Sequence, residues 1–229
     1  MNPLNALARL FGYEFKRRGS GFALHQYLKA DGTFDYERYK RVQTAGNRRK
    51  IEKVWAVEEN IAFLAEFIRG AVGEVRFGIC HGTRRGDEQV WFRKYLDAEV
   101  IGTEISDTAT EFPHTIQWDF HEVKPEWVGA VDFIYSNALD HSYDPRACLD
   151  AWMSCLRPGG VCIIEHSAGH ERATELDPFG APIEEMPYLI LTWGRGRYHV
   201  TQILDAPVKR RAYAKFLVVQ RAAHEEAVR

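Results

Sequence analysis

The sequence lacks any apolar run long enough to cross a membrane as a helix, which takes about 20 residues. Its N-terminal stretch mixes apolar and charged side chains and has no compact apolar core with a cleavage site, so we do not expect a signal peptide. The net charge is only −2, which excludes attraction of the whole molecule to a polyanion. No internal repeat or low-complexity segment is present, so the chain does not have the pattern of a repeat array.

Cysteine is scarce, and none of the residues has the CxxC spacing of a redox or zinc motif. The thiols stand at Cys80, Cys148, Cys155 and Cys162, two of them within apolar, strand-like runs. We therefore expect reduced, buried thiols in a cytoplasmic protein. The 229 residues suffice for one large domain, and 45% hydrophobic with 27% charged residues is ordinary for a globular protein.

What the sequence does contain is an alternation of strand-like and helix-like segments after residue 73. Strands are predicted at 74–80, 98–105, 114–120, 130–139 and 161–166, with helices at 87–96 and 145–156. Strands separated by helix-length segments indicate a parallel sheet covered on both faces. Two final strands, 196–204 and 211–220, are joined by a loop too short for a helical crossover and should pair antiparallel.

The segment in front of this sheet is predicted to be helical over residues 35–69, because apolar residues recur there at steps of three and four. We divide the chain into an N-terminal helical segment or lid (1–70) and an α/β domain (71–229). The residues RPGG (157–160) predict a turn before the fifth strand.

Polar residues follow the predicted strands where each strand ends. The first strand runs into a glycine-containing turn, Gly78–Gly86, whose backbone N–H groups can approach a ligand closely. Such turns are common, so this signal is weak alone. Glu104 ends the second strand, where an acid can accept hydrogen bonds from ribose hydroxyls. Asp119 follows the third strand and Asn137 the fourth, and together these positions predict a ligand site at the carboxyl edge of the sheet.

The run VDFIYSNALDHSYDP (131–145), together with LRPGG (156–160) before an apolar strand, resembles the class I S-adenosylmethionine (SAM) methyltransferases, of the type 11 group that acts on small molecules and sugars. The resemblance covers roughly residues 70–220 and implies a Rossmann-like, seven-stranded, mostly parallel sheet with a terminal antiparallel hairpin, and SAM as cofactor. The first motif departs from the family pattern. An acid usually stands where Gly78 is, and glycines where Cys80 and Arg84 are.

The resemblance also implies a set of cofactor-binding residues. The turn around Cys80–Arg84 would hold the methionine part of SAM, Glu104 the ribose, Asp119 with Phe120 the adenine, and Asn137 with Ala138 the sulfonium side. Arg84 could pair with the cofactor carboxylate or be a solvated helix-start arginine. The full predicted cofactor set is Gly78, Cys80, His81, Gly82, Arg84, Glu104, Ile105, Asp119, Phe120, Asn137, Ala138 and Leu139.

Methylation of oxygen also requires a base, and histidine suits this role near neutral pH. His141 follows the fourth strand and His166 the fifth, so both are candidates, while His170 is a lesser one. Asp140 could orient either imidazole or cap the turn that follows it. Asp140, His141, Glu165 and His166 also offer metal-ligand types, but Ser167 stands where a further carboxylate or amide would be expected, so we predict no required metal.

The basic front segment suggests a substrate-binding face. Four of its residues recur three or four apart and could lie over the pocket of a phosphorylated, nucleotide-linked or acidic sugar, although charge runs are usually solvated. Two further candidates precede the penultimate strand, of which Trp193 could equally be core. The predicted substrate set is Tyr39, Gln43, Asn47, Lys50, Trp193 and Arg195.

These features predict methyl transfer from SAM to an oxygen or nitrogen of a small polar metabolite, with a sugar or sugar nucleotide as first choice. The alternatives are a SAM-binding scaffold that no longer catalyses, which the altered glycine turn would suit, and a nucleic-acid methyltransferase. Near-neutral charge and the lack of an Asn-Pro-Pro-aromatic motif argue against nucleic acid as substrate. We expect no membrane partner, and the oligomeric state, including a homodimer, stays open.

Overall fold

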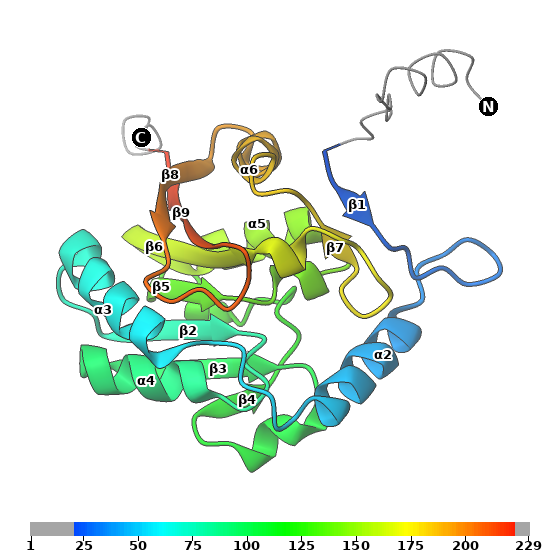
Figure 1. The fold of residues 1–229 in the computed structure, drawn as a ribbon, viewed down its shortest axis with the longest axis horizontal. Coiled ribbons are helices and arrows are strands. Elements are labelled where there is room, and N and C mark those ends of the chain that lie inside the picture. Colours follow the sequence, from blue (N-terminus) through cyan, green and yellow to red (C-terminus); the bar gives the residue numbers. More distant parts are fainter. Residues whose placement is uncertain (1–20, 223–229) are drawn as a thin grey trace.

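The computed structural model describes residues 21–222, so the N-terminal residues judged above for a signal peptide lie outside them. Seven strands form one sheet in the order β4-β3-β2-β5-β6-β9-β8 (Figure 1). Their bounds are β2 (Phe77–His81), β3 (Glu99–Glu104), β4 (Thr115–Gln117), β5 (Val131–Ser136), β6 (Leu156–Ser167), β8 (Tyr198–Asp205) and β9 (Ala214–Arg221). A second, two-stranded sheet pairs β1 (Ala23–Leu24) with β7 (Phe179–Gly180).

The pairing directions confirm the predicted topology. Strands β4, β3, β2, β5 and β6 are parallel to one another, whereas β9 pairs antiparallel with both β6 and β8. Strand β2 lies between β3 and β5, so the chain builds outward on one side of β2 and then on the other. Ligands bind at the carboxyl ends of the strands beside such a switch point.

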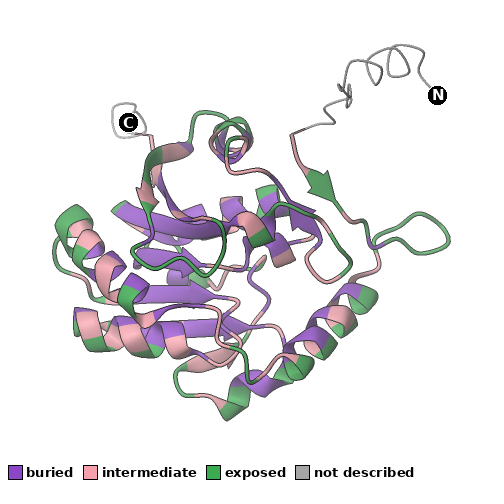
Figure 2. Cartoon of the chain, viewed as in Figure 1, coloured by how far each residue is buried: buried purple, intermediate pink, exposed green. Residues whose placement is uncertain are grey.

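Helices cover both faces of this sheet, and Figure 2 shows the strands buried between them. On one face, α3 (Glu58–Val72) and α4 (Asp87–Leu96) pack against strand residues such as Phe133 and Tyr135. On the other face, α5 (Pro145–Cys155) and α6 (Met186–Gly194) pack against residues such as Ile134. Alternate residues of β5 therefore belong to different core layers, as the period of two along a strand requires.

The helical front segment is two helices rather than one, which corrects the prediction over 35–69. Helix α2 (Tyr36–Arg49) begins at Asp35, whose side chain accepts a hydrogen bond from the Arg38 amide, and it ends before residues 50–57. Its buried residues are largely polar and face the carboxyl edge of the sheet, whereas α3 buries apolar residues against the sheet itself. The turn between the helices is needed because the two faces pack against different parts of the molecule (Figure 1).

Two other predicted boundaries also differ. The RPGG residues lie inside β6 rather than in a turn before it, because Leu156 pairs with Val131 and Val161 with Phe133 around a bulge. Helix α6 has no counterpart among the predicted elements, since its sequence MPYLILTWG is too uniformly apolar to show helical periodicity. Short 3₁₀ turns complete the described chain: η1 (Asp107–Glu111), η2 (Pro125–Trp127), η3 (Leu139–His141) and η4 (Ala168–His170).

Among residues 21–222, every helix is too short or too polar to span a bilayer. Helix α3 shares its core with the sheet, and α2 alone stands at the carboxyl edge. The division of the chain at residue 70 into lid and domain stays a prediction.

Candidate active site

A cavity lies at the carboxyl ends of β2, β3 and β5, beneath α2. It holds about 520 Å³ of empty space, its open mouth included. Its lining consists of Tyr39, Gln43, Gly46, Asn47, Lys50, Gly82, Arg84, Glu104, Ile105, Asp119, Phe120, Ala138, His141 and Leu176.

The turn after β2 brings backbone close to the cavity. The amides of Gly82 and Thr83 both donate to the carbonyl oxygen of Thr103, at 2.9 and 3.1 Å. Gly82 has a φ of +73°, and a Cβ there would lie 2.5 Å from the Cβ of Ala138 at the end of β5. Only glycine therefore fits, and its missing side chain keeps the cavity floor open.

Gly82→Ala is expected to weaken binding of S-adenosylhomocysteine and to lower the melting temperature, because the added Cβ displaces Ala138. Gly32→Ala is the matched control, since Gly32 has a φ of +82° but nothing within 4 Å of an added Cβ. Both variants carry backbone strain of about 1–2 kcal/mol, but only the first should lose affinity in a calorimetric titration. Equal affinity in both would show that the turn does not touch the ligand.

Glu104, the last residue of β3, places a buried carboxylate in the cavity wall. Its Oε2 accepts a hydrogen bond from the Arg84 amide at 3.1 Å, and its Oε1 accepts one from the Ser106 amide at 2.9 Å. Burial raises the pKa of this carboxyl, and the two backbone N–H groups oppose that shift. A carboxylate has about four lone-pair sites, so two acceptor positions remain for a ligand diol.

Asp119 is held in place by a chain of side chains. Its Oδ1 lies 2.7 Å from Nδ1 of His121, and its Oδ2 accepts a hydrogen bond from the Tyr36 hydroxyl of α2 at 2.9 Å. His121 in turn lies 2.7 Å from the Ser142 hydroxyl through Nε2 and stacks on Tyr143. Burial pushes the pKa of Asp119 upward, but the hydrogen bonds from His121 outweigh it and leave the pKa lowered. The carboxylate is therefore ionised and oriented at neutral pH.

The predicted face of α2 does line the cavity, with all four residues Tyr39, Gln43, Asn47 and Lys50. The side chain of Gln43 donates to the Leu176 carbonyl at 2.9 Å, and the Tyr39 hydroxyl donates to the His141 carbonyl at 3.1 Å. The Thr108 hydroxyl donates to Asn47 at 2.9 Å. These bonds tie α2 to the rim, so the helix covers the cavity. Whether its side chains bind substrate stays a prediction.

His141 is the one of the predicted base candidates that reaches this cavity. Its Nδ1 lies 3.0 Å from the Gln43 side-chain oxygen and 2.9 Å from the Leu176 carbonyl, and both partners are acceptors. The proton of the neutral ring is therefore on Nδ1, which leaves Nε2 as the basic nitrogen. Nε2 lies 3.6 Å from a carboxylate oxygen of Asp177, which stabilises the ring once it is protonated.

His166 and Asp140 lie in a separate small hollow with His170, away from the cofactor cavity. Burial lowers the pKa of His166 to about 4, so its ring is neutral at pH 7. Its Nε2 and the Oδ1 of Asp140 are buried with no hydrogen-bond partner among the described residues. β6 continues through residue 167, so His166 is still part of the strand and does not reach the cavity.

Several predicted cofactor residues do not line the cavity. Gly78, Cys80 and Leu139 are buried in the core, and a Cβ at Gly78 would lie 2.1 Å from the Phe133 ring. The His81 ring turns inward to stack on Trp152, and burial lowers its pKa to about 3. These residues shape the floor of the site through packing.

Asn137 lines a second hollow on the other side of the Gly82–Arg84 turn. Trp193 and Arg195 line neither of the two hollows, and their role in substrate binding stays a prediction. Trp193 packs with Phe22 and Phe179, and Arg195 is the exposed C-terminal cap of α6. Trp193 lies in α6 and Arg195 caps this helix, which the sequence pattern did not predict.

One group of metal-ligating side chains occurs within residues 21–222. Asp140, His141 and Asp177 bring one ligand atom each within 4.8 Å of one another. Glu165 and His166, the other donors named from the sequence, are not part of this group. Glu165 instead accepts a hydrogen bond from the Tyr135 hydroxyl at 2.7 Å. We assign no metal to these residues.

The loop between η4 and β7 is a part of the site that sequence reasoning missed. Leu176 lines the cavity, and a Cβ at Gly46 of α2 would lie 2.3 Å from its side chain. Glu175 of the same loop forms an ion pair with Arg38 at 2.6 Å. No local sequence signal marks this loop, because its contacts with α2 are made to residues more than a hundred positions earlier.

Comparisons with known proteins agree with this geometry. Residues 80–164 match the protein family described as a methyltransferase domain. Among solved structures, a Burkholderia thailandensis 1,6-didemethyltoxoflavin-N1-methyltransferase with bound 1,6-didemethyltoxoflavin and S-adenosylhomocysteine is 14% identical, with a TM-score of 0.63 over 90% of this chain and 98% of that one. Magnesium protoporphyrin IX methyltransferase from Synechocystis, with bound SAM, is 13% identical, with a TM-score of 0.57 over 85% of this chain and 100% of that one. A search of curated proteins gives no significant match.

The class predicted from the sequence is therefore confirmed. The fold is that of the class I, SAM-dependent methyltransferases, and residues 80–164 match the family described as a methyltransferase domain. The predicted enzyme class and the predicted cofactor, SAM, agree with these matches. At identities of 13% and 14%, likeness to the solved structures concerns the fold, and the acceptor of the methyl group must be argued from the site.

Proposed function

We propose that this chain transfers a methyl group from SAM to an oxygen or nitrogen of a small polar metabolite, with a sugar or sugar nucleotide as the acceptor. The observation that carries the proposal is the covered cavity at the carboxyl ends of β2, β3 and β5, with the buried carboxylates of Glu104 and Asp119 in its wall. Two structurally similar enzymes act on small molecules, 1,6-didemethyltoxoflavin and magnesium protoporphyrin IX, which supports an acceptor of limited size.

The wall residues fit the parts of SAM. The free lone pairs of Glu104 suit the two ribose hydroxyls, and Asp119 suits the amino group of adenine. Ile105 and Phe120 supply apolar surface for the adenine ring. Gly82 leaves room for the chain that links ribose to the methionine end, because a Cβ there would collide with Ala138.

The cover of the cavity suits a hydroxylated, partly anionic acceptor. Tyr39, Gln43 and Asn47 present polar groups, and Lys50 adds a positive charge. The basic residues of α2 contribute less, since none of them lines the cavity, and Arg38 and Arg48 are paired with Glu175 and Asp107. Lys50 is thus the residue that favours a phosphate or carboxylate on the acceptor.

SAM supplies an electrophilic methyl group when it is bound. The chain contributes alignment in a cavity that α2 shields from water, and His141 serves as the base for an oxygen acceptor. Its Nε2 takes the proton of the acceptor hydroxyl, the Gln43 and Leu176 oxygens hold the ring through Nδ1, and Asp177 stabilises the resulting imidazolium. His166 does not take this role, because it lies in another hollow with a pKa lowered to about 4.

The test is a turnover assay with methyl-labelled SAM and a panel of nucleotide sugars. His141→Gln is expected to lower kcat by about 100-fold or more, the usual contribution of a general base. His166→Gln, the matched control, should change kcat only a few-fold. Both variants should bind S-adenosylhomocysteine like the unaltered protein. Equal losses in the two variants would contradict the assignment, and cofactor binding without turnover of any acceptor would favour the scaffold alternative.

The proposal keeps the cytoplasmic location inferred from cysteine usage. All four cysteines are free and buried, as a reducing compartment allows. The proposal also treats α2 as the lid of the cavity and leaves a homodimer open. Methyl transfer to nucleic acid stays the weaker alternative. Methylation of RNA or DNA, together with no methylation of any nucleotide sugar in the panel, would favour it.

A further inference from the structure

A second hollow adjoins the cofactor cavity across the Gly82–Arg84 turn. Gly82 and Arg84 line both spaces, so the two are neighbours on either side of this turn. The second hollow is also lined by Lys53, Thr83, Glu88 and Asn137. A ligand that fills the main cavity can therefore extend into it past the glycine.

Glu88, the second residue of α4, directs a carboxylate into this hollow from within the protein. The residue is only 5% exposed, and its Oε1 accepts a hydrogen bond from the Asn137 side chain at 3.2 Å. Among residues 21–222, none of the ion pairs includes Glu88. Leaving a carboxylate buried without a cation is costly, so a cation is the partner that this position lacks.

Positively charged residues also line the hollow. The Arg84 guanidinium donates to the Lys53 carbonyl at 2.6 Å, which fixes it between the two spaces. Lys53 itself forms no ion pair with any residue of the described range 21–222. The hollow thus offers an anionic wall at Glu88 and a cationic wall at Arg84 and Lys53, which is the complement of a zwitterionic amino acid.

We infer that Glu88 binds the ammonium group of the amino-acid part of SAM, with Arg84 on its carboxylate. This inference rests on the proposed function, because it places the nucleoside part of the same ligand in the main cavity. It assigns a specificity role to a helix residue outside the glycine turn. An acidic residue at position 78, where the family usually has one, could not take the place of Glu88 here. A Cβ at Gly78 would lie 2.1 Å from the Phe133 ring.

The protonation of Glu88 gives the inference a pH signature. Burial raises its pKa to about 7, Asp87 and Glu165 add to the rise, and the Asn137 hydrogen bond opposes it. Cys80 also lies near this carboxyl. An ammonium ligand favours the ionised form, so binding below pH 7 must first remove a proton. Affinity for S-adenosylhomocysteine should therefore fall by about tenfold between pH 8 and pH 6.

The test compares two ligands in calorimetric titrations of the full chain. S-adenosylhomocysteine carries the amino acid, whereas 5′-methylthioadenosine has the nucleoside and thioether without it. Glu88→Gln is expected to bind S-adenosylhomocysteine at least about 30-fold more weakly, with the pH dependence lost and with unchanged affinity for 5′-methylthioadenosine. Glu66→Gln, which removes a charge from an exposed position of α3, should behave like the unaltered protein.

The outcomes separate the possible failures. Equal losses for both ligands in Glu88→Gln would show a merely structural role and overturn the inference, as would an unchanged affinity for S-adenosylhomocysteine. If the unaltered chain binds neither ligand, the proposed cofactor site itself fails. The melting temperature of the unliganded variant checks folding. It should not fall, because a neutral amide avoids the cost of a buried charge.

Discussion

Glu104→Ala is expected to reduce the affinity for S-adenosylhomocysteine by about 100-fold or more. Hydrogen bonds to a charged group contribute about 1.5–3 kcal/mol each, and two ribose hydroxyls would lose theirs together. Since every 1.4 kcal/mol is about tenfold in affinity, the loss of both bonds alone accounts for about 100-fold. In the unaltered protein the Glu104 carboxylate accepts hydrogen bonds from the Arg84 and Ser106 amides, at 3.1 and 2.9 Å. The Glu104→Ala variant leaves both amides without this acceptor.

The matched control for this variant is Glu99→Ala. Glu99 begins the same strand, β3, but is exposed at the opposite end from the cavity. The Glu99→Ala variant removes the same charge without touching the proposed ribose position. Its affinity for S-adenosylhomocysteine should therefore equal that of the unaltered protein. Calorimetry measures both variants, and a loss in Glu99→Ala as large as in Glu104→Ala would contradict the role given to the strand end.

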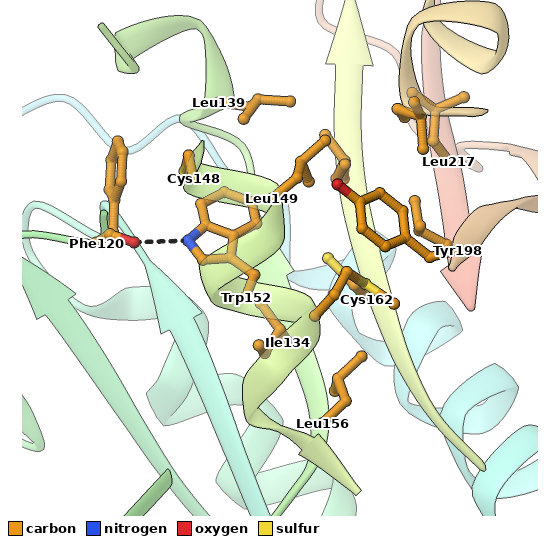
Figure 3. Close-up of a cluster of buried hydrophobic side chains, with 14 of the residues drawn as sticks. Phe120, Ile134, Leu139, Cys148, Leu149, Trp152, Leu156, Cys162, Tyr198 and Leu217 are labelled. Atoms are coloured by element: carbon orange, nitrogen blue, oxygen red, sulfur yellow. Dashed lines mark hydrogen bonds between the residues drawn. The ribbon is translucent and has the colours of Figure 1, made fainter. Parts of the chain in front are cut away.

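Trp152→Ala is expected to lower the free energy of unfolding by about 3–5 kcal/mol, the usual cost of removing a buried aromatic side chain. Trp152 of α5 is 1% exposed and stacks on the His81 ring, with 4.9 Å between ring centroids. Figure 3 shows its indole nitrogen directed at the Phe120 carbonyl, to which it donates at 2.9 Å. The variant should also weaken cofactor binding, because Phe120 lines the cavity.

Two further variants separate packing from hydrogen bonding at this position. Trp152→Phe keeps most of the buried ring but loses the bond to Phe120, so it should cost about 1–2 kcal/mol. Trp91→Ala removes the same kind of side chain from a half-buried position on α4 and should cost less than Trp152→Ala. Urea denaturation measures all three. A Trp152→Ala protein as stable as Trp91→Ala would contradict the importance assigned to this core.

Periodicity predicted the sheet well because alternating burial along a strand is a local property. The helix predicted over 87–96 is found at Asp87–Leu96, and the terminal hairpin pairs as expected. Elements without an amphipathic pattern were not predicted. Helix α6 leaves Tyr188 and Leu191 exposed despite its apolar sequence, so nothing in its pattern distinguished a helix face.

The cofactor wall was predictable to the extent that it lies at strand ends. Glu104 is the last residue of β3 and Asp119 stands two residues after β4, and the parallel arrangement brings them to one edge. The choice between His141 and His166 was not predictable, because it depends on how far β6 continues past the ends of its neighbours. Leu176 and Glu88 also escaped, since their roles arise from contacts between segments distant in sequence.

The measurement that tests the account most directly is a calorimetric titration of the unaltered protein with SAM, S-adenosylhomocysteine and NAD in parallel. We expect one site with micromolar affinity for both adenosyl-sulfur ligands and no binding of NAD. Failure to bind either of the first two, above all together with binding of NAD, would contradict the methyltransferase site described here.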